Sequence, residues 1–460
     1  MANFSKSNVP QFSVDVYQNE YLPEGGREVN AIVTVTSTGG GTIGSPVASP
    51  HLYSAGQGPD AAVAIMVDCS GSMDYPATKM RNARDATAAA IDTLRDGVHF
   101  AVIGGTHVAK EVYPGGGGLA VADARTRDQA KQALRKLSAG GGTAIGTWLR
   151  LADRLLSSAD VSIRHGIVLT DGRNEHEAPE DLKAALDSCA GRFTCDARGV
   201  GTDWEVKEVT GIASALLGTA DIVADPAHLA ADFTQMMETA MGKEVADVAL
   251  RLWTPVGTAI KFVKQVAPRV EELTDRRTEA GPRAGDYPTG SWGDESRDYH
   301  VCVEVPEAGI GQEMLAARVS LVVPQPGGTS RSSAAESGGG STQNLGAQGL
   351  VKAVWTDDMV ASTSINPQVA HYTGQAELAQ VIQQGLDLRK SGDVDGATAK
   401  LGRAVQLASV SGNADTAKLL AKVVDVVDAA AGTVRLKAKV AEADEMTLET
   451  RSTKTVRVKK

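Results

Sequence analysis

The sequence is poor in aromatic residues and in cysteine. Only 4% of its 460 residues are aromatic, whereas glycine occurs 49 times and alanine is abundant, which favours helices that pack through small side chains. Four cysteines are too few for a disulfide framework in a chain of this length. Cys189 and Cys195 lack the second pair or nearby histidine that a zinc site needs. We therefore expect cysteines that act as small buried hydrophobic residues.

Long apolar runs and concentrated positive charge are also missing. No run approaches the ~20 apolar residues of a membrane-spanning helix, and the N-terminus MANFSKSNVPQFSVDV lacks the apolar stretch of a signal peptide. The net charge of −10 argues against a nucleic-acid partner, because phosphate binding needs clustered Lys and Arg. The one basic cluster is the end of the chain, residues 454–460. We expect a cytoplasmic protein without a membrane span.

Residues 59–243 carry short apolar runs that alternate with amphipathic stretches. This alternation is typical of a mostly parallel sheet covered by helices. The second and third runs are so close that they must form a hairpin, which adds one antiparallel strand. The expected strands are 61–67, 98–104, 107–113, 164–170, 193–200 and 220–224, and the expected helices are 77–95, 127–138, 144–158, 179–189, 204–215 and 227–241. The pattern predicts a doubly wound, Rossmann-like α/β domain.

Apolar residues on both sides of this region follow a period of two, as in strands. The N-terminal strands, in residues 1–58, are too few to bury a core alone. We therefore predict that they complete a β-sandwich with residues 244–360, and that the α/β domain is inserted in it. The expected strands are 11–18, 28–37, 245–253, 259–266, 298–305, 316–323 and 350–355. The Gly/Ser-rich residues 325–349 are expected to form a mobile loop.

The C-terminal part has helical periodicity over residues 374–431. Breaks at 391–396 and 411–413 divide it into three helices, which indicates a hairpin of the tetratricopeptide type with a capping helix. We expect a small helical domain over residues 361–432. Residues 433–460 are expected to be a tail, with strand-like alternation at 455–458 and no evident pairing strand.

Oxygen-bearing side chains follow two of the buried strands of the α/β domain, and another opens a helix after a glycine loop. Because the carboxyl ends of the strands of a doubly wound sheet meet at one edge, we expect these side chains to converge there. Carboxylates and neutral hydroxyls are the hard ligands that Mg²⁺ prefers, with Mn²⁺ or Ca²⁺ as alternatives. The alternative interpretation is that the serines cap the next helix and the first Asp caps a turn. The predicted site consists of Asp68, Ser70, Ser72, Thr143 and Asp171.

The motifs that carry these residues resemble the metal-ion-dependent adhesion site of von Willebrand factor A (VWA) domains, in the bacterial cytoplasmic type. They are D-x-S-x-S from Asp68, GGGT-x-x-G around Thr143, and LTDG around Asp171, and the likeness covers about residues 60–243. It implies that the five side chains surround the ion directly or through water. It also implies that an Asp or Glu of a protein partner fills the vacant position. With at most two carboxylates, the ion stays open to such an acid.

The function expected from this resemblance is a metal-dependent protein-interaction and scaffold module that is not an enzyme. One alternative is an accessory subunit of a remodelling or chelatase machine, which presents substrate to a separate AAA+ ATPase. Another is a metal-dependent hydrolase of phosphate esters, which would need a second metal or a general base near Thr143.

Three weaker features allow other interpretations. His176, in the charged loop 171–177, could be a base, but no nucleophile motif accompanies it. That loop could also set partner choice or simply open the next helix. The glycine loop before Thr143 lacks the Lys of a phosphate loop. The threonines of the basic tail could be phosphorylated by a Ser/Thr kinase and bound by a forkhead-associated domain, or the tail could be solvated and disordered. They are Thr447, Thr450, Thr453 and Thr455.

Overall fold

The computed structural model describes residues 10–38, 60–324 and 342–458. These residues form two compact units. The first contains residues 60–246 and Gly290–Gly293, and the second contains residues 10–38, 247–289, 294–324 and 342–458. Most of the predicted Gly/Ser loop, residues 325–341, lies outside the described part of the chain.

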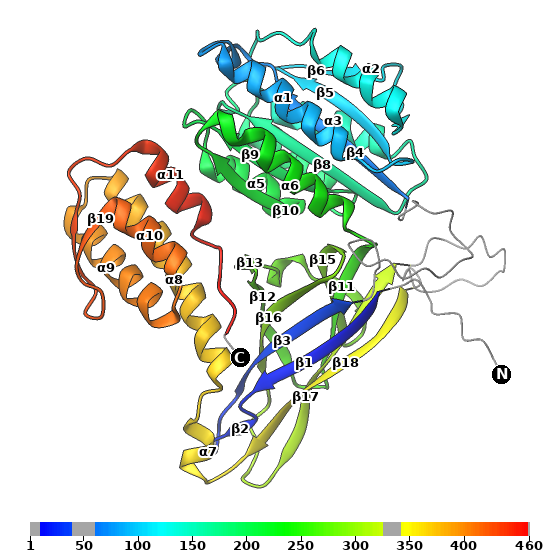
Figure 1. Cartoon of the computed structure of the whole chain (residues 1–460). Helices are drawn as coiled ribbons and strands as arrows, with labels where there is room; N and C mark the ends of the chain where they lie inside the picture. Colours follow the sequence, from blue (N-terminus) through cyan, green and yellow to red (C-terminus); the bar gives the residue numbers. More distant parts are fainter. Residues whose placement is uncertain (1–9, 39–59, 325–341, 459–460) are drawn as a thin grey trace, which may run out of the picture. The chain divides into compact units, whose positions relative to one another are not determined.

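The first unit is built on a mixed sheet with the order β10-β9-β8-β4-β5-β6 (Figure 1). Its strands are β4 (Ala61–Asp68), β5 (His99–Gly105), β6 (Ala109–Tyr113), β7 (Ala120–Val121), β8 (Ile163–Thr170), β9 (Thr194–Val200) and β10 (Leu217–Val223). Strand β4 lies parallel to β5 and β8, and β5 pairs antiparallel with β6, as the short connection predicted. Every residue of β4 is buried, which explains its continuous apolar run, since a central parallel strand is covered on both faces.

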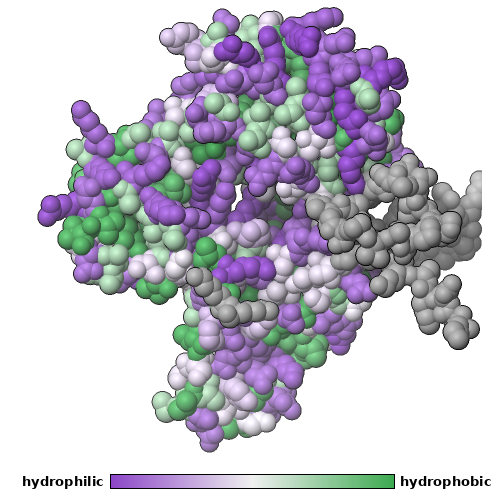
Figure 2. Space-filling model, in the orientation of Figure 1, coloured by the Kyte–Doolittle hydropathy of each residue, from purple (hydrophilic) through white to green (hydrophobic). Residues whose placement is uncertain are grey.

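Two groups of helices cover this sheet. The helices are α1 (Thr78–Thr93), α2 (Ala124–Leu134), α3 (Ile145–Leu156), α4 (Pro179–Cys189), α5 (Val206–Ala215) and α6 (Leu229–Met241). Helix α1 packs beside α2 and α6, and α3 packs beside α4. Each turns apolar positions inward, as in α3, where Trp148 and Leu149 are fully buried. On the face shown in Figure 2, hydrophilic side chains cover most of this unit. The predicted doubly wound α/β fold is confirmed.

The second unit contains a β-sandwich whose sheets have the orders β1-β3-β16-β12-β13 and β14-β15-β11-β17-β18-β2. Its strands are β1 (Gln11–Gln18), β2 (Tyr21–Leu22), β3 (Glu28–Thr38), β11 (Val245–Trp253), β12 (Ala259–Ala267), β13 (Glu271–Glu272), β14 (Thr278–Gly281), β15 (Ala284–Trp292), β16 (Glu295–Glu304), β17 (Glu313–Pro324) and β18 (Thr342–Trp355). Strand β3 pairs with β16 from Glu28 opposite Glu304 to Ser37 opposite Glu295. The N-terminal strands therefore complete the later sheet, and the predicted insertion is confirmed.

Two parts of the sandwich differ from the sequence prediction. Strand β15 was not predicted, because Pro288 and the glycines at 285 and 290 interrupt the alternation that marks a strand. Residues 342–349, which were predicted to be loop, belong to β18. There Gly349 lies opposite Val319 and Asn344 opposite Val322, so pairing with β17 orders a segment whose composition alone favours a loop.

The second unit ends in a helical domain, and its last part differs from the predicted tail. The elements are α7 (Met359–Thr363), α8 (Pro367–Lys390), α9 (Val394–Ser411), α10 (Ala414–Val423), β19 (Val424–Asp428), β20 (Thr433–Leu436) and α11 (Glu442–Arg451). Residues 424–428 are a strand paired with 433–436 and not helix, as suits a run rich in β-branched valine. Val434 and Leu448 belong to the same apolar core as α8 and α9. Residues 433–458 are therefore part of the domain.

The four cysteines are free and buried, as the sequence predicted. Among the residues that the structure describes, no helix is long and apolar enough to cross a membrane.

Candidate metal centre

Three loops meet at the carboxyl edge of the α/β sheet, and backbone hydrogen bonds join them. The loop after β4 bonds to the glycine loop, since Gly140 N–H donates to Cys69 O (2.8 Å) and Gly71 N–H donates to Gly141 O (2.9 Å). The loop after β8 is joined to the glycine loop because His176 N–H donates to Thr143 O (3.0 Å). These bonds place the three predicted motifs side by side, as the strand-end argument required.

Ser70 and Ser72, in the loop after β4, connect Asp68 to Asp171. The Ser70 and Ser72 hydroxyls are 2.9 Å apart, and Ser72 Oγ donates to Asp171 Oδ1 at 2.7 Å. Asp68 is fully buried and Ser70 is nearly so. Asp68 Oδ1 accepts a 2.7 Å hydrogen bond from Ser70 N–H. The four side chains thus form one connected set of oxygens.

Thr143 completes this set from the glycine loop. A Cβ placed on Gly172 would lie 3.1 Å from Ser72 Oγ and 3.8 Å from Thr143 Oγ1, so both hydroxyls border the same space. The loop needs glycine, because Gly141 has a φ of +88°. A Cβ on Gly142 would lie 2.2 Å from the His176 ring. All five predicted residues therefore come together.

Burial makes the carboxylate of Asp68 costly to ionise. It raises the pKa of Asp68 to about 6, although hydrogen bonds from Ser70 and Thr170 favour the charged form. Thr170 Oγ1 donates to Asp68 Oδ2 at 2.7 Å. A carboxylate that is buried and held by neutral donors is one that a nearby cation would stabilise.

Lys79 supplies one positive charge to this site, and the sequence interpretation missed it. Its Nζ lies 2.7 Å from Asp171 Oδ2 and 3.2 Å from Asp203 Oδ2. Burial acts to lower the pKa of Lys79, but the hydrogen bonds to Asp171 and Asp203 outweigh it and raise the pKa above its usual value. Lys79 carried no motif signal. Thr170 belongs to the LTDG motif, but its bond to Asp68 joins residues 102 positions apart, and the pattern gave no sign of it.

Side chains of the charged loop after Asp171 accept hydrogen bonds from the start of α3. Ile145 N–H donates to Asn174 Oδ1 (2.8 Å) and Gly146 N–H donates to Glu177 Oε2 (2.8 Å), which satisfies two free amides of the helix N-terminus. His176 Nδ1 accepts a 3.3 Å hydrogen bond from Thr143 N–H. These three side chains therefore hold the Thr143 segment in place.

The donor set fits a hard divalent cation. It offers two carboxylates and three hydroxyls, all oxygen, at a strand edge where one lysine leaves net negative charge. Within the described ranges, no cluster of three or more His, Cys, Asp or Glu side chains could hold a metal. A metal here would therefore depend on the hydroxyls of Ser70, Ser72 and Thr143 as well as on Asp68 and Asp171.

Comparisons with known proteins agree with the fold. Residues 61–222 match the model of the von Willebrand factor type A domain, and residues 406–452 match that of the von Willebrand factor type A C-terminal domain. A solved structure described as von Willebrand factor type A from Catenulispora acidiphila is 51% identical, with a TM-score of 0.87 over 99% of each chain. The chain belongs to the von Willebrand factor type A family.

The resemblance of the α/β domain to VWA domains is thus confirmed at the level of family and fold. The ArnB paralog VWA2 from Sulfolobus acidocaldarius, at 13% identity, has the same fold with a TM-score of 0.56 over 96% of this chain and 98% of that one. No curated protein matches the chain. The C-terminal VWA model spans residues that the sequence interpretation had divided between the helical domain and the tail.

Proposed function

We propose that this chain is a metal-dependent protein-interaction and scaffold module, and not an enzyme. VWA domains commonly take part in metal-dependent protein interactions. In this proposal Mg²⁺, or Mn²⁺ or Ca²⁺ in its place, is held by Asp68, Ser70, Ser72, Thr143 and Asp171, and an Asp or Glu of a partner binds the ion. The observation that carries the proposal is the joining of two strand-end loops and the glycine loop, which brings the oxygens of these five side chains to one edge of the sheet.

The net charge of these five side chains and Lys79 supports the binding of a carboxylate from a protein partner. Lys79 already neutralises one of the two carboxylates, so a bound divalent ion would leave the site with a net positive charge. An incoming carboxylate would then gain from direct attraction to the ion, and the gain grows when docking excludes water. A site with four acidic ligands would have no such attraction to offer.

Metal binding is tested by titrating Mg²⁺ and Mn²⁺ into the chelator-treated full chain by calorimetry. We expect Asp68→Asn to abolish binding, because it removes a charged ligand without changing the size of the side chain. The matched control is Asp160→Asn. Asp160 is exposed and precedes β8, at the opposite end of that strand from Asp171. Unchanged Mg²⁺ binding by Asp68→Asn would contradict the proposal.

Partner binding is tested by purifying the tagged chain from its native cells with and without EDTA and identifying what is lost. We expect EDTA to release the partner and added Mg²⁺ to restore it, with Asp68→Asn matching the effect of EDTA. Co-purification of a separate AAA+ ATPase would favour the alternative of a substrate-presenting subunit.

A kinase or forkhead-associated partner at the C-terminal threonines would require the end of the domain to open first. Thr450 is 4% exposed, and Thr455 Oγ1 donates to Val266 O at 2.6 Å. Phosphorylation would therefore be expected only after these contacts break.

A further inference from the structure

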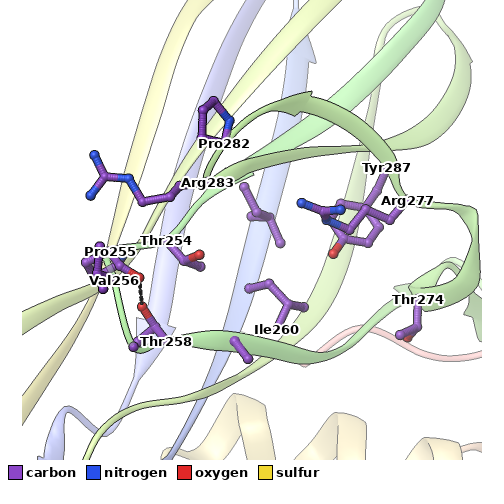
Figure 3. A pocket seen from close by; sticks show the side chains of 13 residues that line it. Thr254, Pro255, Val256, Thr258, Ile260, Thr274, Arg277, Pro282, Arg283 and Tyr287 are labelled. Carbon is purple, nitrogen blue, oxygen red and sulfur yellow. Dashed lines mark hydrogen bonds between the residues drawn. The ribbon is translucent and has the colours of Figure 1, made fainter.

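The two sheets of the β-sandwich pack closely along one side and leave a cavity along the other. On one side β1 lies against β18, where the Gln18 amide donates to Lys352 O (2.9 Å) and accepts from Lys352 N–H (3.1 Å). The packing is so close that a Cβ on Gly349 would lie 2.6 Å from Val16. On the other side, between β12 of one sheet and β11 and β15 of the other, a cavity of about 480 Å³ remains (Figure 3). That volume is in the range of small-molecule sites.

The lining of this cavity mixes apolar and polar groups. Leu252 and Tyr287, from β11 and β15, are 2% and 1% exposed, and Ile260 of β12 faces them. The hydroxyls of Thr254, Thr258 and Thr274 add polar groups. Burial raises the pKa of Tyr287, although the neighbouring Arg277 acts to lower it, and the phenol is a hydrogen-bonding group. The cavity thus offers polar and apolar surface in similar amounts.

The charged side chains that line the cavity are all positive. Arg277 and Arg283 line the cavity, and none of its lining residues, all in the described part of the chain, is acidic. Figure 3 shows Arg277 beside Tyr287, with the Arg277 guanidinium pointing toward the middle of the cavity. Arg283 lies at the opposite edge of the cavity. Guanidinium groups bind carboxylates through paired, charge-assisted hydrogen bonds.

Arg277 bonds to the Tyr287 side chain and to two further partners that an incoming carboxylate can replace. Its guanidinium donates to Glu279 Oε1 at 3.0 Å and to Ala284 O at 3.3 Å. The Glu279 side chain is 80% exposed, and an ion pair of that exposure contributes little to stability. The Arg277 side chain is itself 37% exposed, so an incoming carboxylate can reach its guanidinium.

We propose that this cavity is a binding site for a small organic carboxylate with an aromatic or branched aliphatic body. The apolar body packs on Leu252, Ile260 and Tyr287, and the carboxylate bonds to Arg277, with Arg283 adding positive charge at the edge. The site is separate from the metal centre, since all its residues belong to the β-sandwich. Its occupancy is therefore independent of the metal.

The probe pair is 2-naphthoate and 2-naphthol, which share a ring system and differ in charge. Each is titrated by calorimetry into the full chain in the presence of EDTA, so that the metal centre plays no part. We expect 2-naphthoate to bind about tenfold or more tightly than 2-naphthol, as one charge-assisted hydrogen bond provides. Equal affinity for the two, or no binding of 2-naphthoate, overturns the proposal.

Three variants locate the binding. Arg277→Met should weaken 2-naphthoate binding about tenfold or more, and Glu279→Gln should strengthen it, because the competing carboxylate is gone. The matched control is Arg318→Met: Arg318 and Arg283 both lie near the Trp253 ring, at 5.4 and 5.0 Å, but Arg318 does not line the cavity. The unfolding midpoint of each variant shows that it is folded. Unchanged affinity in folded Arg277→Met, or equal loss in Arg318→Met, places the probe elsewhere and overturns the assignment.

Discussion

Lys79 holds the buried carboxylate of Asp171 at the candidate metal centre. The two side chains are 8% and 0% exposed and 2.7 Å apart. Removal of one member of a buried pair leaves the other charge without compensation, which costs about 3–5 kcal/mol. At the same time the ammonium repels a divalent ion that would occupy the same oxygens. Lys79 therefore has opposite effects on the stability of the metal-free chain and on its affinity for metal.

We predict that Lys79→Met lowers the free energy of unfolding in EDTA by about 3 kcal/mol and strengthens Mg²⁺ binding. Urea unfolding and calorimetric titration measure the two effects. The control is Lys183→Met, which removes the exposed pair of Lys183 with Asp187 and should cost less than about 1 kcal/mol. Weaker Mg²⁺ binding by Lys79→Met would contradict the prediction.

His300 gives the β-sandwich a defined response to acid. It is 6% exposed in β16, and burial, with a smaller effect of Lys264, lowers its pKa from 6.5 to about 4. The folded chain thus keeps the imidazole neutral at a pH where the unfolded chain protonates it. The stabilisation is complete above about pH 6.5 and is lost as the pH falls toward 4.

From this shift we expect wild type to lose about 3 kcal/mol of stability between pH 7 and pH 4 through His300 alone, at 1.36 kcal/mol for each pKa unit. The variant His300→Gln cannot titrate and keeps a side chain that can bond to Asn30, whose Oδ1 lies 2.9 Å from His300 Nε2. Urea unfolding across this pH range should show a shallower acid loss in the variant. Parallel curves for the two proteins would show that His300 does not titrate in this way.

At the scale of elements, the last residues of the chain join the helical domain to the sandwich. Thr455 N–H donates to Pro268 O (3.0 Å), and His371 Nε2 of α8 lies 2.7 Å from Val456 O. Asp298 of β16 is 3% exposed and accepts hydrogen bonds from three elements. The donors are Thr34 of β3 (2.7 Å), Tyr372 of α8 and Arg457 of the C-terminal segment (3.3 Å).

We predict that Asp298→Ala releases residues 453–458, because it leaves Tyr372 and Arg457 without their shared acceptor, and that it costs about 3 kcal/mol. Hydrogen exchange followed by mass spectrometry should show faster exchange in this segment. The matched control is Thr34→Val, which removes the contact to Asp298 inside the sandwich only. It should lower stability without raising exchange at 453–458; equal exchange in both variants would argue against a joining role for Asp298.

At the scale of the whole molecule, the insertion of the α/β domain makes the β-sandwich depend on pairing between distant parts of the chain. Thr34 and Asp298, which are hydrogen-bonded, are 264 residues apart. Strands β1 and β3, from the N-terminal part of the chain, pair in the described structure within the sheet that contains β16 and β12. The α/β domain, in contrast, contains all the strands of its own sheet. The residues of the candidate metal centre therefore lie within one continuous stretch of the chain, whereas the strands of the sandwich do not.

The sequence by itself determined the α/β domain and the five oxygen-bearing residues of the candidate metal centre. Apolar periodicity and strand length are local properties, and the carboxyl ends of parallel strands necessarily share one edge. Those two facts were enough to bring Asp68 and Asp171 together before any coordinates, and the glycine-loop motif added Thr143.

Only the tertiary structure revealed Lys79 at that centre, the bond of Thr170 to Asp68, the joining role of Asp298 and the cavity beside Arg277. Each depends on contacts between residues far apart in the chain, such as Lys79 and Asp171 at a separation of 92 residues. It also showed that residues 342–349 and 433–458 are ordered. Composition favours a loop or tail there, but pairing with β17 and packing of Leu448 against α8 and α9 outweigh that local preference.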